Sequence, residues 1–341
     1  IATLALGVGA NVAVFSLFRQ VLVQALPVPA SEQLVNLEVE GREGLRLSTS
    51  ASGGMESVLS YPLFRELEQA AGEAGQVAGH RLLSVNLALA GRSENARALL
   101  VSGNYFATLG LNPTHGRLIS PDDSRTPGQA QAAVLAHGYW RDAFAADPGI
   151  VGRTLRINGQ TMQIVGIGPQ GFGSTTLGAE PAVYLPVTLS APQGAMLPSH
   201  DRLDFHWLYA FARPAQGVQP AALQARLDAA FQRAMSGDAD FSAEGVPPQH
   251  LVLTPGARGQ SSAPGQSRQP LALAQGVALL VLAIACVNLA NLQLAQNYLR
   301  AGKLDLAMDR ANRALRHDPD SADVQIVLHL AAQALVRAGY A

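Results

Sequence analysis

The sequence contains a single cysteine, Cys286, and only 14% of its 341 residues are charged. One thiol cannot form an internal disulfide or a thiolate metal cluster, so the fold must depend on its hydrophobic core. Lysine and arginine (24 residues) nearly balance aspartate and glutamate (25 residues), which gives a formal net charge of −1. Nucleic-acid binding needs a strongly basic surface, and the near-neutral charge therefore argues against a nucleic-acid partner.

Sequence motifs for catalysis are also lacking. The chain has no Gly-x-Ser-x-Gly turn, no His-Glu-x-x-His motif and no Walker motif. A cluster of histidines and aspartates does not have the ligand spacing of a standard metal site, and we interpret it as a solvated loop: His200, Asp201, Asp204 and His206. We therefore predict that the protein is not an enzyme, with no catalytic residue, no cofactor and no metal ion.

One glycine pattern resembles a nucleotide-binding motif. Three glycines follow a predicted strand at the spacing of a dinucleotide fingerprint: Gly166, Gly168 and Gly171. Pro169 lies inside the pattern and no helix is predicted after it, so no helix N-terminus would meet a pyrophosphate. We interpret these glycines as a turn.

Apolar sequence is concentrated in two stretches. Residues 1–18 and residues 271–299 contain no charged side chain. At about 1.5 Å per residue, either stretch is long enough to cross a hydrocarbon core. We predict transmembrane helices at residues 1–26, truncated at its N-terminus, and at residues 271–293. A signal peptide and a buried soluble helix are the alternatives for the first stretch.

The residues around the second stretch predict its orientation. Basic residues are frequent after it (Arg300, Lys303, Arg310, Arg313 and Arg316), and only Arg258 and Arg268 lie shortly before it. By the positive-inside rule the C-terminus is cytoplasmic, and residues 27–270 form the main domain outside the cytoplasm. Asn288 and Asn291 are polar residues within the stretch, and we assign them to helix packing, with a substrate path as the alternative.

Residues 27–270 show two similar sets of secondary-structure signals. Alternating apolar residues predict a strand at 35–40, followed by a helix that starts at Ser60-Pro62 and a strand near 85–89. The same order recurs later, as a strand, a helix and a strand: 206–211, 220–235 and 251–253. We predict two βαβ halves.

An inserted β-rich lobe is predicted between the two halves, at about residues 99–198. Strands are expected at 132–135, 155–157 and 162–165, with a short helix at 139–144. Asn158-Gly159 separates two of these strands, and this dipeptide is a strong signal for a two-residue hairpin.

Five stretches of the sequence carry a family resemblance: LALGVGANVAVFSLFRQVLVQALPVP, SYPLFRELE, VSGNYFATLGLNPTHGRLISPDD, VLAHGYWRDAFAADPGIVGRTLRINGQTMQIVGIGPQGF and LVLAIACVNLANLQLA. From residue 1 to about residue 295 they resemble the MacB/FtsX-type permeases of ABC transporters, in particular the orphan permeases of that group. The resemblance implies a bacterial inner-membrane permease whose periplasmic domain, a porter-like lobe with an inserted lobe, lies between the first two membrane helices. It also implies mechanotransmission driven by a separate cytoplasmic ATPase subunit, with the lipid bilayer and a second permease copy as further partners.

The sequence departs from that family after the second apolar stretch. Six residues there have the spacing of a tetratricopeptide repeat: Leu294, Tyr298, Gly302, Ala307, Ala314 and Pro319. We predict a helical hairpin over residues 294–341 that offers a site for a protein partner. The alternative is an amphipathic helix pair of no particular family. Because residues 289–294 belong to both patterns, we expect the tail to be foreign to the permease, as in a truncated or chimaeric gene product.

The predicted fold class is therefore α+β. It comprises a membrane-anchored periplasmic domain of two βαβ halves with an inserted lobe, two transmembrane helices and a C-terminal helical hairpin. The predicted function is that of a non-catalytic membrane component of an ABC-type transport or mechanotransmission system. The alternative is a membrane-tethered periplasmic binding or scaffold protein with a protein-binding tail.

Overall fold

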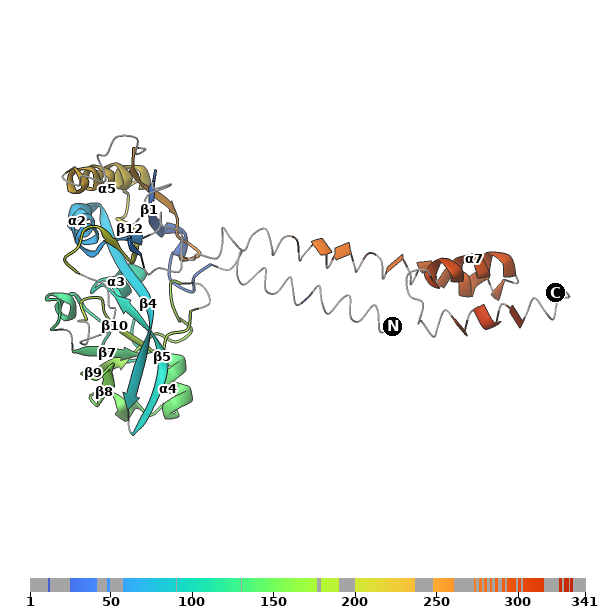
Figure 1. Cartoon of the computed structure of the whole chain (residues 1–341), viewed down its shortest axis with the longest axis horizontal. Coiled ribbons are helices and arrows are strands. Elements are labelled where there is room, and N and C mark those ends of the chain that lie inside the picture. Colours follow the sequence, from blue (N-terminus) through green and yellow to red (C-terminus); the bar gives the residue numbers. More distant parts are fainter. Residues whose placement is uncertain are drawn as a thin grey trace. The chain divides into compact units, whose positions relative to one another are not determined.

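The structure is a computed structural model of the chain (Figure 1). It describes most of residues 25–260, with gaps at 42–47, 50–57, 90, 130, 177–178, 190–199 and 237–247, together with residue 12 and part of residues 273–333. The chain divides into two compact units, Gln24–Ala263 and a second unit of Ile1–Val23 with Pro264–Ala341. We call Gln24–Ala263 the core domain.

The core domain is built on one sheet, ordered β13-β1-β12-β4-β5-β10-β7-β9-β6. Its first part is formed by β1 (Val35–Glu40), α2 (Tyr61–Ala71), β4 (Gly75–Leu89), β12 (Leu208–Pro214), α5 (Pro220–Met235) and β13 (His250–Pro255). Strand β1 is antiparallel to β12 and β13, and β12 is antiparallel to β4. Consequently β1 runs parallel to β4 with β12 between them, and β12 runs parallel to β13 with β1 between them. Two split βαβ units therefore interlock in a ferredoxin-like arrangement, which confirms the predicted halves.

Helices α2 and α5 lie side by side on one face of this sheet (Figure 1). Each presents one apolar stripe to the core: Leu63, Phe64, Leu67 and Ala71 on α2, and Leu223, Leu227 and Phe231 on α5 are buried. Burial of each large side chain contributes about 1.5–3 kcal/mol. The opposite face is covered by α3 (Tyr105–Leu109), whose aromatic side chains pack in a second cluster with Leu99 and Phe211. The sheet is thus buried on both faces in this region.

The second part of the sheet continues along the long hairpin of β4 and β5 (Arg92–Val101). It comprises β6 (His115–Gly116), β7 (Ala132–Leu135), α4 (His137–Phe144), β8 (Thr154–Ile157), β9 (Gln160–Ile167) and β10 (Val183–Pro186). Asn158 and Gly159 have positive φ of 47° and 87° and connect β8 to β9, as predicted for a two-residue hairpin. One sheet runs through both parts, and the boundaries given above for the inserted lobe stay a prediction.

Short elements complete the core domain. The strands are β2 (Ser48–Thr49), β3 (Val58–Leu59) and β11 (Phe205–His206), and the 3-10 helices are η2 (Ser31–Gln33), η4 (Gly72–Ala74), η5 (Pro121–Ser124) and η6 (Pro148–Ile150). The strand predicted at 206–211 is divided into β11 and β12 at Trp207, whose N–H donates to the carbonyl of Leu59. The strand predicted near 85–89 begins earlier, at Gly75.

The second unit contains α7 (Leu304–Leu315), where Ala307 and Ala311 are buried, as is Ala295 before it. Of the repeat-like positions, Gly302 and Pro319 lie outside the described residues, as does Asn288, whereas Asn291, Leu294 and Tyr298 are helical. The repeat assignment therefore stays a prediction. Among the helices of the described residues, none has the length and apolar composition needed to span a membrane. The two predicted membrane helices fall largely outside the described residues.

Candidate functional site

The two ends of the core domain, which connect to the predicted membrane helices, lie against each other. The Leu26 N–H donates to the carbonyl of Ala257 over 2.8 Å, and the Gly256 N–H donates to the carbonyl of Leu34 over 2.7 Å. The Leu26 side chain is buried beside this contact. We call residues 26–30 and 256–260 the anchor seam. These bonds tie the first residues of the core domain to its last ones.

Arg213, at the end of β12, holds the first segment of the seam. Its guanidinium donates to the carbonyls of Pro29 and Ala30, both over 2.9 Å, and to that of Thr108 over 2.7 Å. Burial lowers the pKa of Arg213, but a guanidinium titrates so far above neutrality that the side chain stays charged. The rigid fork of donors thereby ties the segment to both β12 and α3.

The second segment of the seam passes very close to residues 175–176. Gly259 has a φ of 74°, and a Cβ at this position would lie 2.1 Å from the carbonyl oxygen of Thr175. The Gln260 N–H donates to that same oxygen over 2.8 Å. Thr175 is also bound by Tyr105, because the Thr175 N–H donates to the Tyr105 hydroxyl over 3.2 Å. Glycine at 259 thus permits an approach that a side chain would prevent.

Gln260 also bonds to the sheet through its buried side chain. Its Nε2 donates to the carbonyl of Ala210 on β12, and its Oε1 lies 2.7 Å from Nε2 of His80 on β4. Because the amide nitrogen is committed to Ala210, Oε1 is the acceptor and His80 carries its proton on Nε2. Burial lowers the pKa of His80 to about 4, an effect that the bond from Gln260 opposes and the nearby Arg81 reinforces. His80 is therefore neutral at pH 7.

Sequence reasoning did not identify the polar residues that bind the seam to the sheet. Arg213, Gln260 and His80 stand in no motif, since their bonds join residues that are far apart in the chain. The residues that the sequence did single out lie elsewhere. In the described part of the chain, no group of three or more histidine, cysteine, aspartate or glutamate side chains could hold a metal ion.

The histidine and aspartate cluster is not assembled into one site by the fold. His200 contacts the carbonyl of Val187, Asp204 pairs with Arg202, and His206 lies near the carbonyl of Asp204. The glycine pattern is likewise a turn: the Gly168 N–H donates to the carbonyl of Leu135, and Gly171 has a φ of 76°. No helix begins between residues 169 and 176.

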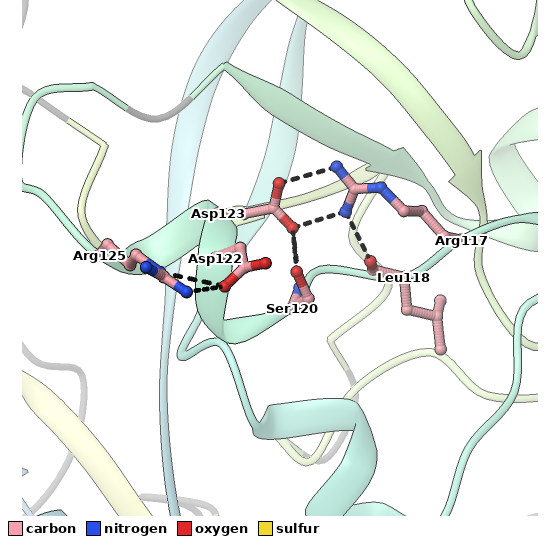
Figure 2. Close-up of polar contacts among 6 residues, drawn as sticks. All are labelled: Arg117, Leu118, Ser120, Asp122, Asp123 and Arg125. Atoms are coloured by element: carbon pink, nitrogen blue, oxygen red, sulfur yellow. Dashed lines mark hydrogen bonds and ion pairs between the residues drawn. The ribbon is translucent and has the colours of Figure 1, made fainter.

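The stretch LNPTHGRLISPDD forms a hydrogen-bonded loop around η5, which we call the Asp123 lock after its central residue (Figure 2). Arg117 binds both carboxylate oxygens of Asp123, over 2.6 and 2.9 Å. Asp123 also accepts from the N–H and the hydroxyl of Ser120, each over 2.9 Å. Burial raises the pKa of Asp123, but the bonds from Arg117 and Ser120 outweigh this effect and leave the pKa lowered. The motif fixes a loop.

Two neighbouring aspartates make this lock testable. The Asp123 side chain is 10% exposed, whereas Asp122, which pairs with Arg125, is 76% exposed. We expect Asp123→Asn to lower the free energy of unfolding by about 1–2 kcal/mol and Asp122→Asn by less than about 0.5 kcal/mol. Urea unfolding followed by tryptophan fluorescence measures both. Equal losses for the two variants would contradict a structural role specific to Asp123.

The family model of the MacB-like periplasmic core domain matches residues 1–230. Nothing among the curated proteins matches.

Three solved structures are similar to the chain at low sequence identity. The periplasmic region of MacB from Actinobacillus actinomycetemcomitans is 14% identical, with a TM-score of 0.46, over 72% of this chain and 94% of that chain. A domain of a putative permease protein from Porphyromonas gingivalis is 16% identical, with a TM-score of 0.43, over 67% and 92%. The extracellular domain of the noncanonic ABC-type transporter YknZ from Gram-positive bacteria is 11% identical, with a TM-score of 0.41, over 64% and 99%.

Proposed function

The chain belongs to the family of MacB-like periplasmic core domains, and from this membership we propose that it acts as a mechanotransmitting, non-catalytic component of an ABC-type permease. The anchor seam is the observation that supports this function. It joins both ends of the core domain to each other and to the sheet, as a domain moved from its two ends requires.

The proposed movement starts outside the core domain. A separate cytoplasmic ATPase subunit would supply the energy, and the membrane helices would carry the movement to residues 26–30 and 256–260. Arg213 and Gln260 bind main-chain carbonyls and side chains on β4, β12 and α3, so a displacement of the seam would move the sheet as well. The work of this chain is a change between conformations, with no covalent chemistry.

The membrane arrangement is part of the proposal. Two transmembrane helices, at 1–26 and 271–293, would place the core domain in the periplasm of a bacterial cell and the C-terminus in the cytoplasm. The uncharged stretches and the basic residues after the second one support this topology. The lipid bilayer, an ATPase subunit and a second permease copy are the proposed partners, with Asn288 and Asn291 at helix contacts.

A second function is favoured by the tail. Leu306, Ile326 and Leu330 are about half exposed in helical segments, while Ala307 and Ala311 are buried. Exposed leucines and isoleucines beside small buried residues are suited to binding another protein helix. On this alternative, the chain is a membrane-tethered scaffold, and isolation of the full chain would recover a protein bound to the tail and no ATPase subunit.

Reporter fusions test the proposed topology. Alkaline phosphatase fused at Gly128, in the core domain, should be active, because that enzyme needs the oxidising periplasm. The same fusion after residue 341 should be inactive. A cytoplasmic reporter that is active at Gly128 would contradict the proposal. Copurification of an ATPase subunit with the full chain would separate the permease function from the scaffold alternative.

A further inference from the structure

Gln260 is the one seam residue whose side chain bonds to two strands of the sheet. Its amide binds His80 on β4 and Ala210 on β12, each over 2.7 Å, and its main chain binds Thr175. The side chain is almost wholly buried, at 5% exposure for the residue. The oxygen and the nitrogen of this amide thus each have a partner inside the domain.

The main-chain bonds of the second segment do not by themselves define its position. They comprise the bonds from Leu26 to Ala257, from Gly256 to Leu34 and from Gln260 to Thr175, with a single parallel bridge between Thr176 and Gln260. Main-chain bonds are independent of side-chain identity and can form again after a shift along the chain. A buried side chain that matches one donor and one acceptor cannot do so, since the shift leaves His80 and Ala210 unpaired.

The surroundings of His80 leave Gln260 as its hydrogen-bond partner. Its ring is fully buried and lies 5.6 Å from that of Tyr209 and 5.9 Å from that of Tyr105. Its Nδ1 is buried with no hydrogen-bond partner among the described residues. Gln260 is therefore the polar contact that the described structure provides for the imidazole, and removing it leaves an unsatisfied donor as well.

We propose that Gln260 is a positioning residue, whose side chain sets the register of residues 256–260 on β4 and β12. The inference rests on the proposed function, because the register matters for function only if this segment transmits movement from the second membrane helix. With Gln260 in place, the segment and the sheet move as one body. Without it, the segment shifts while the sheet keeps its fold.

Distance measurement between two spin labels tests the register in the full chain. Arg258 and Glu66 are exposed and are changed to cysteine in a Cys286→Ser background, purified in detergent. The chain with Gln260 should give one narrow distance distribution. Gln260→Leu should give a distribution about twice as wide or a second distance, since the segment then samples other registers.

Gln232→Leu is the matched control. Gln232 also donates through its amide to a main-chain carbonyl, that of Gln249 over 2.6 Å, but it lies outside the seam. This variant should keep the narrow distribution. Equal broadening in both variants, or a narrow distribution in Gln260→Leu, would overturn the proposal.

A double variant separates positioning from simple stabilisation. His80→Leu with Gln260→Leu replaces both partners by apolar groups, which should recover much of the free energy of unfolding lost in Gln260→Leu alone. The distribution should remain wide. If it narrows as stability returns, the glutamine acts only through stability and the proposal is wrong.

Two further outcomes remain distinguishable. If Gln260→Leu does not fold, Gln260→Glu is measured in its place. The carboxylate keeps the acceptor for His80 and removes the donor to Ala210. The same widths of the distance distribution then support or overturn the proposal. Failure of the proposed permease function would appear as the absence of an ATPase subunit that copurifies with the full chain, a result that does not depend on the label distances.

Discussion

Gly259→Ala is expected to lower the free energy of unfolding by about 3 kcal/mol or more, whereas Gly217→Ala is expected to lower it by about 1 kcal/mol. Both glycines have a positive φ, 74° and 81°, so backbone strain is common to the two variants. The two glycines differ in the free space around a Cβ. A Cβ at 259 would lie 2.1 Å from the Thr175 carbonyl oxygen, whereas nothing lies within 4 Å of one at 217.

Tryptophan fluorescence during urea unfolding of the full chain measures this difference. The chain has two tryptophans, and both Trp140 and Trp207 are buried in the core domain. The signal therefore reports the unfolding of that domain in the presence of the rest of the chain. A loss at Gly259 no larger than that at Gly217 would show that residues 175–176 can move away without cost, and the close contact of the seam would then have no energetic role.

Much of the fold was predictable because many elements bury only one face. In β1 the buried residues Leu37 and Val39 alternate with more exposed ones, and α2 and α5 carry a single apolar stripe. Such periodic patterns follow from the geometry of strands and helices. The turn at Asn158-Gly159 was predictable for a different reason, since both residues must adopt a positive φ and few residues do so readily.

The first half of β4 and the whole of β5 were not predicted. The β4 sequence begins GQVAGH. It contains glycines and polar residues, which are uncommon in strands. A side chain at Gly79 would crowd the core, because a Cβ would lie 2.8 Å from the Leu208 side chain and 3.0 Å from that of Phe64. In β5, residues 98–101 are buried on both faces of the sheet and do not alternate. Tertiary packing, which the local pattern does not contain, decides both strands.

The polar residues that bind the anchor seam to the sheet were unpredictable for a related reason. Arg213 binds carbonyls at Pro29 and Ala30, and Gln260 binds a carbonyl at Ala210. Main-chain carbonyls occur at every residue, so such contacts have no sequence motif. By contrast, the stretch LNPTHGRLISPDD was part of the family resemblance in the sequence, and its polar residues bind one another within a loop. Conspicuous polar motifs here fix local structure, and the candidate functional contacts are non-local.

Acidification from pH 7 to pH 4 is expected to lower the free energy of unfolding by about 3 kcal/mol through His80 alone. The histidine has a folded-state pKa of about 4, against an ordinary value of 6.5. As the pH falls below 6.5, the unfolded chain binds a proton at His80 and the folded chain does not. Stability from this residue is therefore complete above pH 6.5, declines between 6.5 and 4, and stays constant below 4.

The surroundings of His80 explain why the folded state resists protonation. Arg81 on the same strand adds positive charge, and Tyr105 and Tyr209 face the ring with hydroxyls whose pKa burial raises, so they are neutral. Gln260 satisfies Nε2 in either protonation state, but a proton on Nδ1 would have no acceptor among the described residues. Protonation thus places an uncompensated charge beneath the seam.

His80→Phe separates this effect from other acid-sensitive groups. The aromatic ring preserves packing and cannot titrate, so the decline of stability between pH 6.5 and 4.5 should largely disappear, although the lost bond to Gln260 lowers stability at pH 7 by about 1–2 kcal/mol. His115→Gln, at an exposed position, should keep the decline. Carboxylates with lowered pKa, such as Asp123 and Asp228, lose their contribution only at lower pH. Burial raises the pKa of Glu68, so this group changes stability in the opposite direction as the pH falls, and it does so equally in both variants. An unchanged decline in His80→Phe would mean that another group controls the response to acid and that the seam is not its origin.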